Sequence, residues 1–127
     1  MTDSYKLGIE HILSGRYFEA HEELELVWRA APPEERDFYQ GLVHVAVAWY
    51  QHGRGRPVAT RRQLEKALRR LAPYEPAHRG VDVAALRAQL ASLLERGDLG
   101  GRQPDGLEGA VEGDVQPPVP MEEEEQP

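Results

Sequence analysis

The stretch "RDFYQGLVHVAVAWYQH" (residues 36–52) determines the architecture, because it is apolar around most of a helical circumference. At about 100° per residue, one stripe of this helix contains Phe38, Leu42, Val45 and Trp49. Other directions are also apolar, through Tyr39, Val43, Val47 and Tyr50. Only a narrow strip is polar, with Asp37, Gln40, His44 and Gln51. A helix of this kind is normally enclosed by neighbours, so we expect it to be the central element of a bundle.

Periodicity and helix-end signals predict the flanking elements. A short helix is expected from an N-cap at Ser4 through Ser14, and a second from about Tyr17 to Ala30, ended by Pro32-Pro33. After "GRGRP" (53–57), Pro57 is placed as the first residue of a fourth helix. "APYEPAHRG" (72–80) is expected to be a loop, followed by a helix capped by Asp82 and ended by Gly97. These elements predict an all-α, compact antiparallel bundle of four to five helices over residues 1–97.

Residues 98–127 have a different composition. They contain nine Asp or Glu residues against the single base Arg102, with repeated Gly and Pro. Such a segment buries too little apolar surface to offset the entropy of ordering, so we expect a disordered acidic tail. The tail accounts for the net charge of -7. Within residues 1–97, the bases concentrate after residue 52, so we expect one basic side on an otherwise balanced domain.

Several classes of protein are excluded by composition. The chain has no cysteine, which removes disulfides, thiol nucleophiles and thiolate metal sites. No stretch approaches the roughly 18 apolar residues of a membrane span. The start "MTDSYKLGIEH" lacks the basic and apolar regions of a secretory signal. We therefore expect a cytoplasmic protein without membrane contact.

The stretch "GRYFEAHEELELVW" (15–28), followed by "QGLVHVAVAWYQHGRGRPVATRRQLEKALRRLAPY" (40–74), resembles DUF309, a family of small all-helical proteins of unknown function. The positions that carry the resemblance are Gly15, Tyr17, Ala20, His21, Glu22, Leu24, Glu25, Trp28, Gln40 and Gly41. The resemblance extends over roughly residues 5–95 and stops before the tail. It implies a helical fold and brings no activity, substrate or cofactor with it. His44 matches no signature position of the family.

A polar cluster is the main candidate for a site. His21 and Glu25 are four residues apart, so they are neighbours on one helical surface. The full candidate cluster consists of His21, Glu22, Glu25, Gln40 and His44. The residues that we expect to line an adjoining pocket are Tyr17, Trp28 and Trp49.

Three interpretations of His21 remain open. The favoured one is structural, since an unpaired buried polar group costs about 1–3 kcal/mol and a partner fixes one packing arrangement. The second is a zinc, iron or manganese site with His21 and Glu25 as ligands, completed by His44 or Gln40. A stable site needs three or four ligands, so we expect no cofactor and keep a divalent metal as the alternative. The third is acid–base catalysis, with Glu25 orienting His21.

The helix from Pro57 is rich in arginine and could contact phosphates. Because the sequence shows no helix-turn-helix pattern and no aromatic residues interleaved on that face, it does not favour a nucleic-acid partner. The sequence leaves the partner unknown, with a protein partner and a second copy of the chain both open. The leading hypothesis is a non-enzymatic binding or assembly module, and the alternative is a metal-dependent or His–Glu enzyme that uses the "HEELE" helix.

Overall fold

The structure is a computed structural model, and it describes residues 3–97, 99 and 101–112. Over this part of the chain it contains five α-helices: α1 (Ser4–Leu13), α2 (Tyr17–Ala30), α3 (Pro33–Gly53), α4 (Pro57–Leu71) and α5 (Val83–Arg96). Two single turns of 3-10 helix follow α4 and α5, η1 (Ala72–Tyr74) and η2 (Glu108–Ala110). The all-α bundle predicted from the sequence is confirmed.

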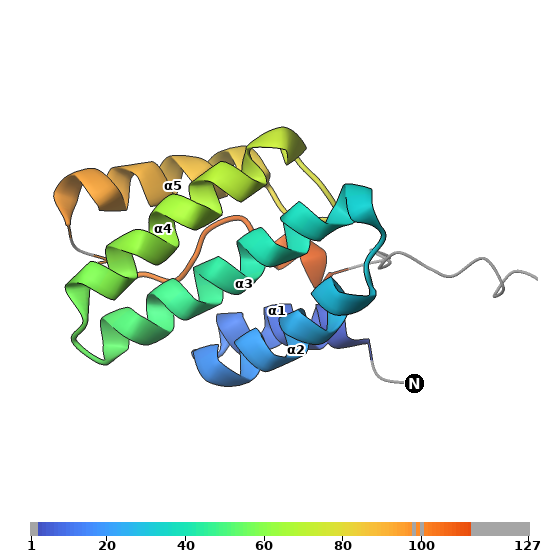
Figure 1. Cartoon of the computed structure of the whole chain (residues 1–127), viewed down its shortest axis with the longest axis horizontal. Helices are drawn as coiled ribbons and strands as arrows, with labels where there is room; N and C mark the ends of the chain where they lie inside the picture. Colours follow the sequence, from blue (N-terminus) through green and yellow to red (C-terminus); the bar gives the residue numbers. More distant parts are fainter. Residues whose placement is uncertain (1–2, 98, 100, 113–127) are drawn as a thin grey trace, which may run out of the picture.

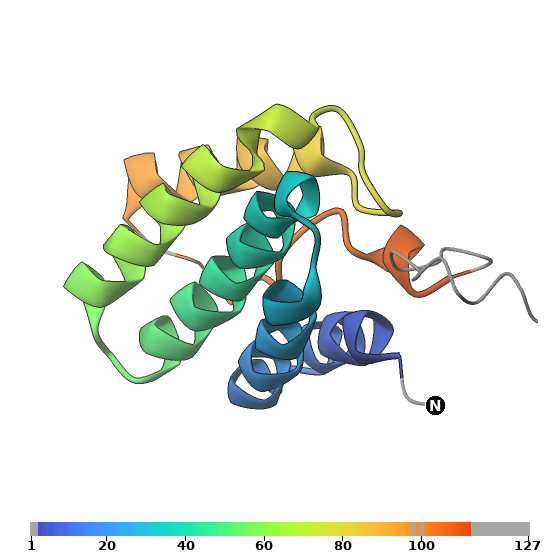
Figure 2. The same ribbon diagram turned by 45° about the vertical axis from the view of Figure 1, so that its right-hand side comes forward.

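The long helix α3 runs through the middle of the molecule (Figure 1). The α1–α2 hairpin covers one side of it, and α4 packs along the other with α5 beyond (Figures 1 and 2). The stripe Phe38, Leu42, Val45 and Trp49 is buried, and Tyr39, Ala46 and Ala48 are fully buried in other directions. The predicted central position of this helix is therefore confirmed. None of the described helices is both long and apolar enough to cross a membrane.

The helix ends follow the predicted signals closely. Asp82 accepts a hydrogen bond from the Ala85 amide at 2.9 Å, and Gly97 ends α5 in the left-handed conformation (φ 74°). Pro57 is the first residue of α4. The predicted cap at Ser4 is wrong by one residue, because Asp3 accepts from the Lys6 amide and Ser4 is already helical. α3 begins earlier than predicted, at Pro33, since proline is well suited to a first helical turn.

The segment after α5 differs from the disorder expected for residues 98–127. Pro104 is buried, and Leu99, Leu107 and Ala110 are buried in the core. Trp49 donates a hydrogen bond from its indole Nε1 to the Arg102 carbonyl at 2.7 Å. The Asp105 amide donates a hydrogen bond to Oε1 of Gln89, also at 2.7 Å. Residues 99 and 101–112 therefore belong to the packed domain, whose boundary lies beyond the predicted residue 97. Residues 113–127, with the acidic run 122–125, lie outside the described part.

The composition of residues 98–127 predicted disorder because it is dominated by Gly, Pro and acidic residues, whereas only a few residues hold the segment after α5 in place. The few buried side chains of the segment pack in the core, and main-chain hydrogen bonds also hold the segment in place. The Asp82 amide donates to the Gly106 carbonyl at 2.9 Å. Gly106 has φ +82°, and a Cβ there would lie 2.6 Å from the Asp82 carbonyl oxygen, so only glycine allows this approach.

Replacing Gly41 by alanine should destabilise the fold, because the helices α3 and α4 approach closely there. A Cβ at Gly41 would lie 2.7 Å from both Cγ and Cδ2 of the buried Leu71. We expect Gly41→Ala to lower the free energy of unfolding by about 1–3 kcal/mol, measured by urea titration. Gly53→Ala is the matched control in the same helix, since nothing lies within 4 Å of the position that its Cβ would occupy. Equal stability of the two variants would contradict the close approach.

Leu107→Ala tests whether the segment after α5 is part of the core. Leu107 is completely buried, so its truncation should cost about 2–5 kcal/mol in the same titration. Leu26→Ala, at a leucine that is 52% exposed on α2, should change stability little. A Leu107 variant as stable as the Leu26 variant would restore the original expectation of a disordered tail.

Candidate functional site

The predicted His21–Glu25 pair is present on α2. Nε2 of His21 lies 3.2 Å from Oε2 of Glu25, as expected for positions one helical turn apart. Both side chains are partly exposed, at 26% and 32%. Glu25 also contacts Arg29 through its other oxygen at 3.3 Å, so the carboxylate is shared between an imidazole and a guanidinium.

The other imidazole nitrogen of His21 is the unusual feature of the pair. Nδ1 is buried and has no hydrogen-bond partner among the described residues. The ring of Phe18 lies 5.7 Å from the His21 ring, which places an aromatic residue directly beside it. The pair is therefore held at the edge of the α2–α3 packing, and one of its polar atoms is left unsatisfied.

The remaining members of the predicted polar cluster do not join His21. Glu22 is exposed on α2, and Gln40 lies half-buried on α3. His44 faces α4, where its Nδ1 lies 2.7 Å from Oε1 of Gln63. No group of three His, Asp or Glu side chains in the described residues is arranged to hold a metal ion. The geometry thus brings together two of the five candidates and places His44 in a separate contact.

The predicted pocket residues are also spread apart. Trp28 is half-buried beneath Arg36, whose guanidinium carbon lies 5.1 Å from the ring centroid. Trp49 is buried and turned toward Arg102. Tyr17 is half-buried at the start of α2, where burial raises the pKa of its hydroxyl. A cavity of about 250 Å³ lies elsewhere, between α4 and the end of α5, with Leu64, Leu93 and Leu94 among its lining residues.

A second charged cluster, which the sequence did not indicate, lies at the opposite end of α3. Oε1 of Glu35 contacts Nε2 of His78 at 2.8 Å and Nε of Arg79 at 3.1 Å. Burial raises the pKa of Glu35, but the hydrogen bonds from His78 and Arg79 outweigh it and leave that pKa below its usual value. Tyr5 donates to the Arg79 carbonyl at 2.7 Å. The cluster fastens the loop after η1 to α1 and α3.

The sequence did not indicate this cluster because Glu35 is 43 residues from His78 and 44 from Arg79, and these two lie in a stretch that resembles an ordinary loop. The only available signal was the presence of His78 and Arg79 within "EPAHRG". The Phe38 ring packs edge-on against the His78 ring at 4.6 Å, so the loop that carries His78 also contacts the aromatic core. The arrangement is that of a structural clasp.

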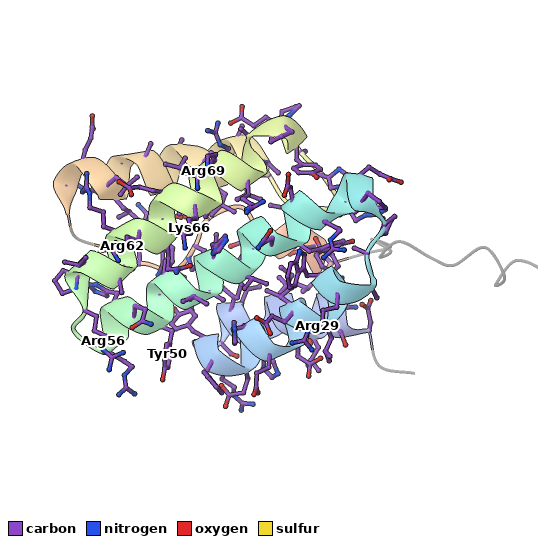
Figure 3. All side chains as sticks on the ribbon, viewed as in Figure 1. Arg29, Tyr50, Arg56, Arg62, Lys66 and Arg69 are labelled. Carbon is purple, nitrogen blue, oxygen red and sulfur yellow. The ribbon has the colours of Figure 1, made fainter. Side chains whose placement is uncertain are left out.

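The basic side of the domain lies on α4. Arg62, Lys66 and Arg69 are exposed and follow one another along the helix, and we call them the cationic stripe (Figure 3). Other bases nearby are paired, Arg61 with Glu65 at 3.5 Å and Arg70 with Asp37 at 2.7 Å. Within the described part of the chain, the three residues of the cationic stripe form no ion pair.

The electrostatic effect of this side is visible at His44. Burial lowers the pKa of the His44 imidazole, and repulsion from Lys66, Arg70 and Arg69 lowers it further. The hydrogen bond to Gln63 acts in the opposite direction and is outweighed. The bases of α4 therefore act on a side chain of α3 across the contact between the two helices.

An aromatic pair lies at the contact between α2 and α3, on the side of α3 opposite the one that α4 covers. The rings of Phe18 on α2 and Tyr50 on α3 lie 5.6 Å apart, and Phe18 is 47% exposed. Arg54 donates to the Tyr50 hydroxyl at 3.2 Å and lies 5.6 Å from the centroid of its ring. Figure 3 shows the Tyr50 side chain projecting from α3 away from α4, and Arg56 near the end of α4 that carries Arg62. The aromatic pair therefore comes from α2 and α3 and not from α4.

Comparison with known proteins finds the family described as "Domain of unknown function (DUF309)" over residues 5–63. An uncharacterized protein of Aquifex aeolicus is 31% identical over 88 residues, which cover 68% of this chain and 26% of that protein. The uncharacterized protein YpuF of Bacillus subtilis is 36% identical over 81 residues, which cover 62% of this chain and 45% of YpuF. The chain thus spans less than half the length of both curated relatives. No solved structure matches.

Glu35→Gln tests the clasp through its dependence on pH. Because the folded-state pKa of Glu35 is lowered, its stabilisation is present above the pKa of the unfolded chain and is lost as pH falls through the folded-state value. At pH 7 we expect the variant to lose about 1–3 kcal/mol of unfolding free energy in urea titrations. The difference from the wild type should shrink as the pH is lowered through the range below about 4.5. A difference that does not change with pH would contradict the assignment.

Proposed function

We propose, on the premise that residues 5–63 carry a DUF309 domain, that this domain is a non-enzymatic binding module whose ligand is a polyanion. The binding surface is the face formed by α3 and α4, with the cationic stripe at its centre. A cytoplasmic location is part of the same proposal. The single observation that carries it is the row of three exposed cations on α4 without acidic partners among the described residues.

The imbalance of charge on α4 supports the proposal. The helix holds five bases, Arg61, Arg62, Lys66, Arg69 and Arg70, against the single acid Glu65. Like charges one turn apart destabilise a helix slightly, so repulsion within the cationic stripe lowers the stability of α4. A bound anion reduces this repulsion. The apolar side of α4, with Leu64, Ala67 and Leu71, is buried in the core and holds the helix in place. The cations are thus presented on a fixed support.

The arrangement around His21 supports binding over catalysis. A general base needs a reacting group within hydrogen-bond reach, and Nδ1 of His21 is buried away from solvent. The other nitrogen is occupied by Glu25. The contact with Glu25 supports the structural role favoured from the sequence, in which a hydrogen-bonded partner of His21 fixes one packing arrangement.

Neutralising two residues of the cationic stripe should weaken polyanion binding. The probe is inorganic polyphosphate of about a dozen phosphates, titrated at several salt concentrations with affinity measured by calorimetry. We expect wild-type affinity to fall steeply with salt, and Arg62→Gln/Lys66→Gln to reduce the slope of log affinity against log salt by about 1–2.

The matched control is Lys6→Gln/Arg96→Gln, which also removes one lysine and one arginine. These residues lie on α1 and at the end of α5, and neither belongs to the cationic stripe. The control should bind polyphosphate with nearly the wild-type slope. An equal loss of polyphosphate affinity in both double variants would show that only net charge matters and not the position of the cationic stripe. Absence of binding by the wild type at low salt would refute the proposed function.

A further inference from the structure

We propose that the polyanion is a single-stranded nucleic acid, whose backbone follows the cationic stripe and whose bases stack on the aromatic pair Phe18–Tyr50. This inference rests on the proposed function and narrows it to one class of ligand. Proteins that bind single strands combine a basic track for the phosphates with exposed aromatic rings for the bases. Both parts are present here, the cationic stripe on α4 and the aromatic pair on α2 and α3, so the bound strand crosses α3 between them.

Phe18 offers a ring on which a base can stack. Phe18 is 47% exposed, so nearly half of its surface is accessible to a ligand. Its ring is tilted by 47° against that of Tyr50, so Tyr50 does not cover it face to face. His21, tilted by 39°, supports it from within α2. Part of the Phe18 ring is therefore open to a flat partner, and it is held in place by two neighbouring rings.

A cation lies beside the aromatic pair. The Arg54 guanidinium is held over the Tyr50 ring by its hydrogen bond to the hydroxyl. A guanidinium in this position can contact a phosphate while a base stacks on the neighbouring ring. Arg54 is exposed and forms no ion pair within the described residues. The aromatic pair and the stripe are thus linked by bases along the turn between α3 and α4.

The spacing of the cations along α4 suits a repeated charge. With a rise of about 1.5 Å per residue, Lys66 lies one turn, or about 6 Å, beyond Arg62, and Arg69 lies about 4.5 Å further. These intervals allow successive phosphates of a flexible strand to be contacted in turn. Long lysine and arginine side chains adapt to the backbone, so no fixed groove is needed. The site requires a ligand whose charges are repeated and whose bases are free.

Duplexes and membranes fit this face less well. In a duplex the bases are stacked inside the helix, so an exposed ring at the rim would have no base to contact. A helix that binds a bilayer surface inserts its apolar face, but the apolar face of α4 is already buried in the core. A single strand uses both the cations and the aromatic pair.

The test compares two probes with similar charge, of which only one carries bases. The full-length protein is titrated with a fluorescently labelled single-stranded oligonucleotide of about 12 thymidines, and with inorganic polyphosphate of similar length, at one low salt concentration. Phe18→Ala should weaken oligonucleotide binding about tenfold or more and leave polyphosphate binding unchanged. Leu26→Ala removes an exposed apolar residue from the same helix and should change neither affinity.

Each outcome separates this inference from the proposed function. If Phe18→Ala weakens binding of both probes equally or of neither, the single-strand inference fails while polyanion binding stands. If the wild type binds neither probe, both fail together. Binding to phosphatidylserine vesicles without binding to the oligonucleotide would assign the face to a membrane surface and overturn the inference. Because Phe18 is half exposed, all variants should remain folded, which circular dichroism checks.

Discussion

The fold depends on the need to cover α3 on several sides at once. Its buried residues point in all directions except one narrow strip, so no single partner helix could satisfy it. The α1–α2 hairpin, α4 and the segment after α5 each cover part of its circumference. At Gly41 the contact is close enough that Leu71 occupies the space of a missing side chain. Every other feature of the molecule is arranged around this central helix.

The uncovered strip of α3 determines where a site can form. His44 lies on this strip between α3 and α4, and Tyr50 extends it toward α2. The two helices that flank the strip differ in charge, because α2 carries four glutamates against one arginine and α4 carries five bases against one glutamate. Packing therefore places the basic helix α4 and the acidic helix α2 on opposite sides of α3, with the aromatic pair at the contact between α2 and α3. The proposed binding surface is a consequence of how the core is closed.

The sequence predicted what depends on local pattern. The helices, the cap at Asp82, the turn at Gly97 and the position of Pro57 follow from neighbouring residues, and the structure agrees with each. The His21–Glu25 contact was predictable for the same reason, because both residues lie on one turn of one helix. Periodicity of 3.6 residues and helix-end signals are sufficient information for all of these.

What the sequence did not predict depends on contacts between distant residues. Leu107 and Ala110 lie in an acidic, glycine-rich segment, and they are buried only because they pack against core residues that are distant in the sequence. Glu35 meets His78 and Arg79 across more than 40 residues. The aromatic residues near the cationic stripe come from α2 and α3, so inspection of α4 alone could not find them. Composition and residue spacing carry no information on such long-range contacts.

The face between α2, α3 and α4 is the surface on which a single strand should bind. A map of backbone amide chemical-shift changes, recorded while a single-stranded oligonucleotide is added to the full chain, locates the bound strand residue by residue. We expect the changes to be concentrated along Arg62 to Arg69, around Phe18 and at the turn after Tyr50, with α5 unaffected. Changes centred on the cavity near Leu93 and Leu94, or on the clasp at Glu35 and His78, would place the strand elsewhere and contradict this assignment.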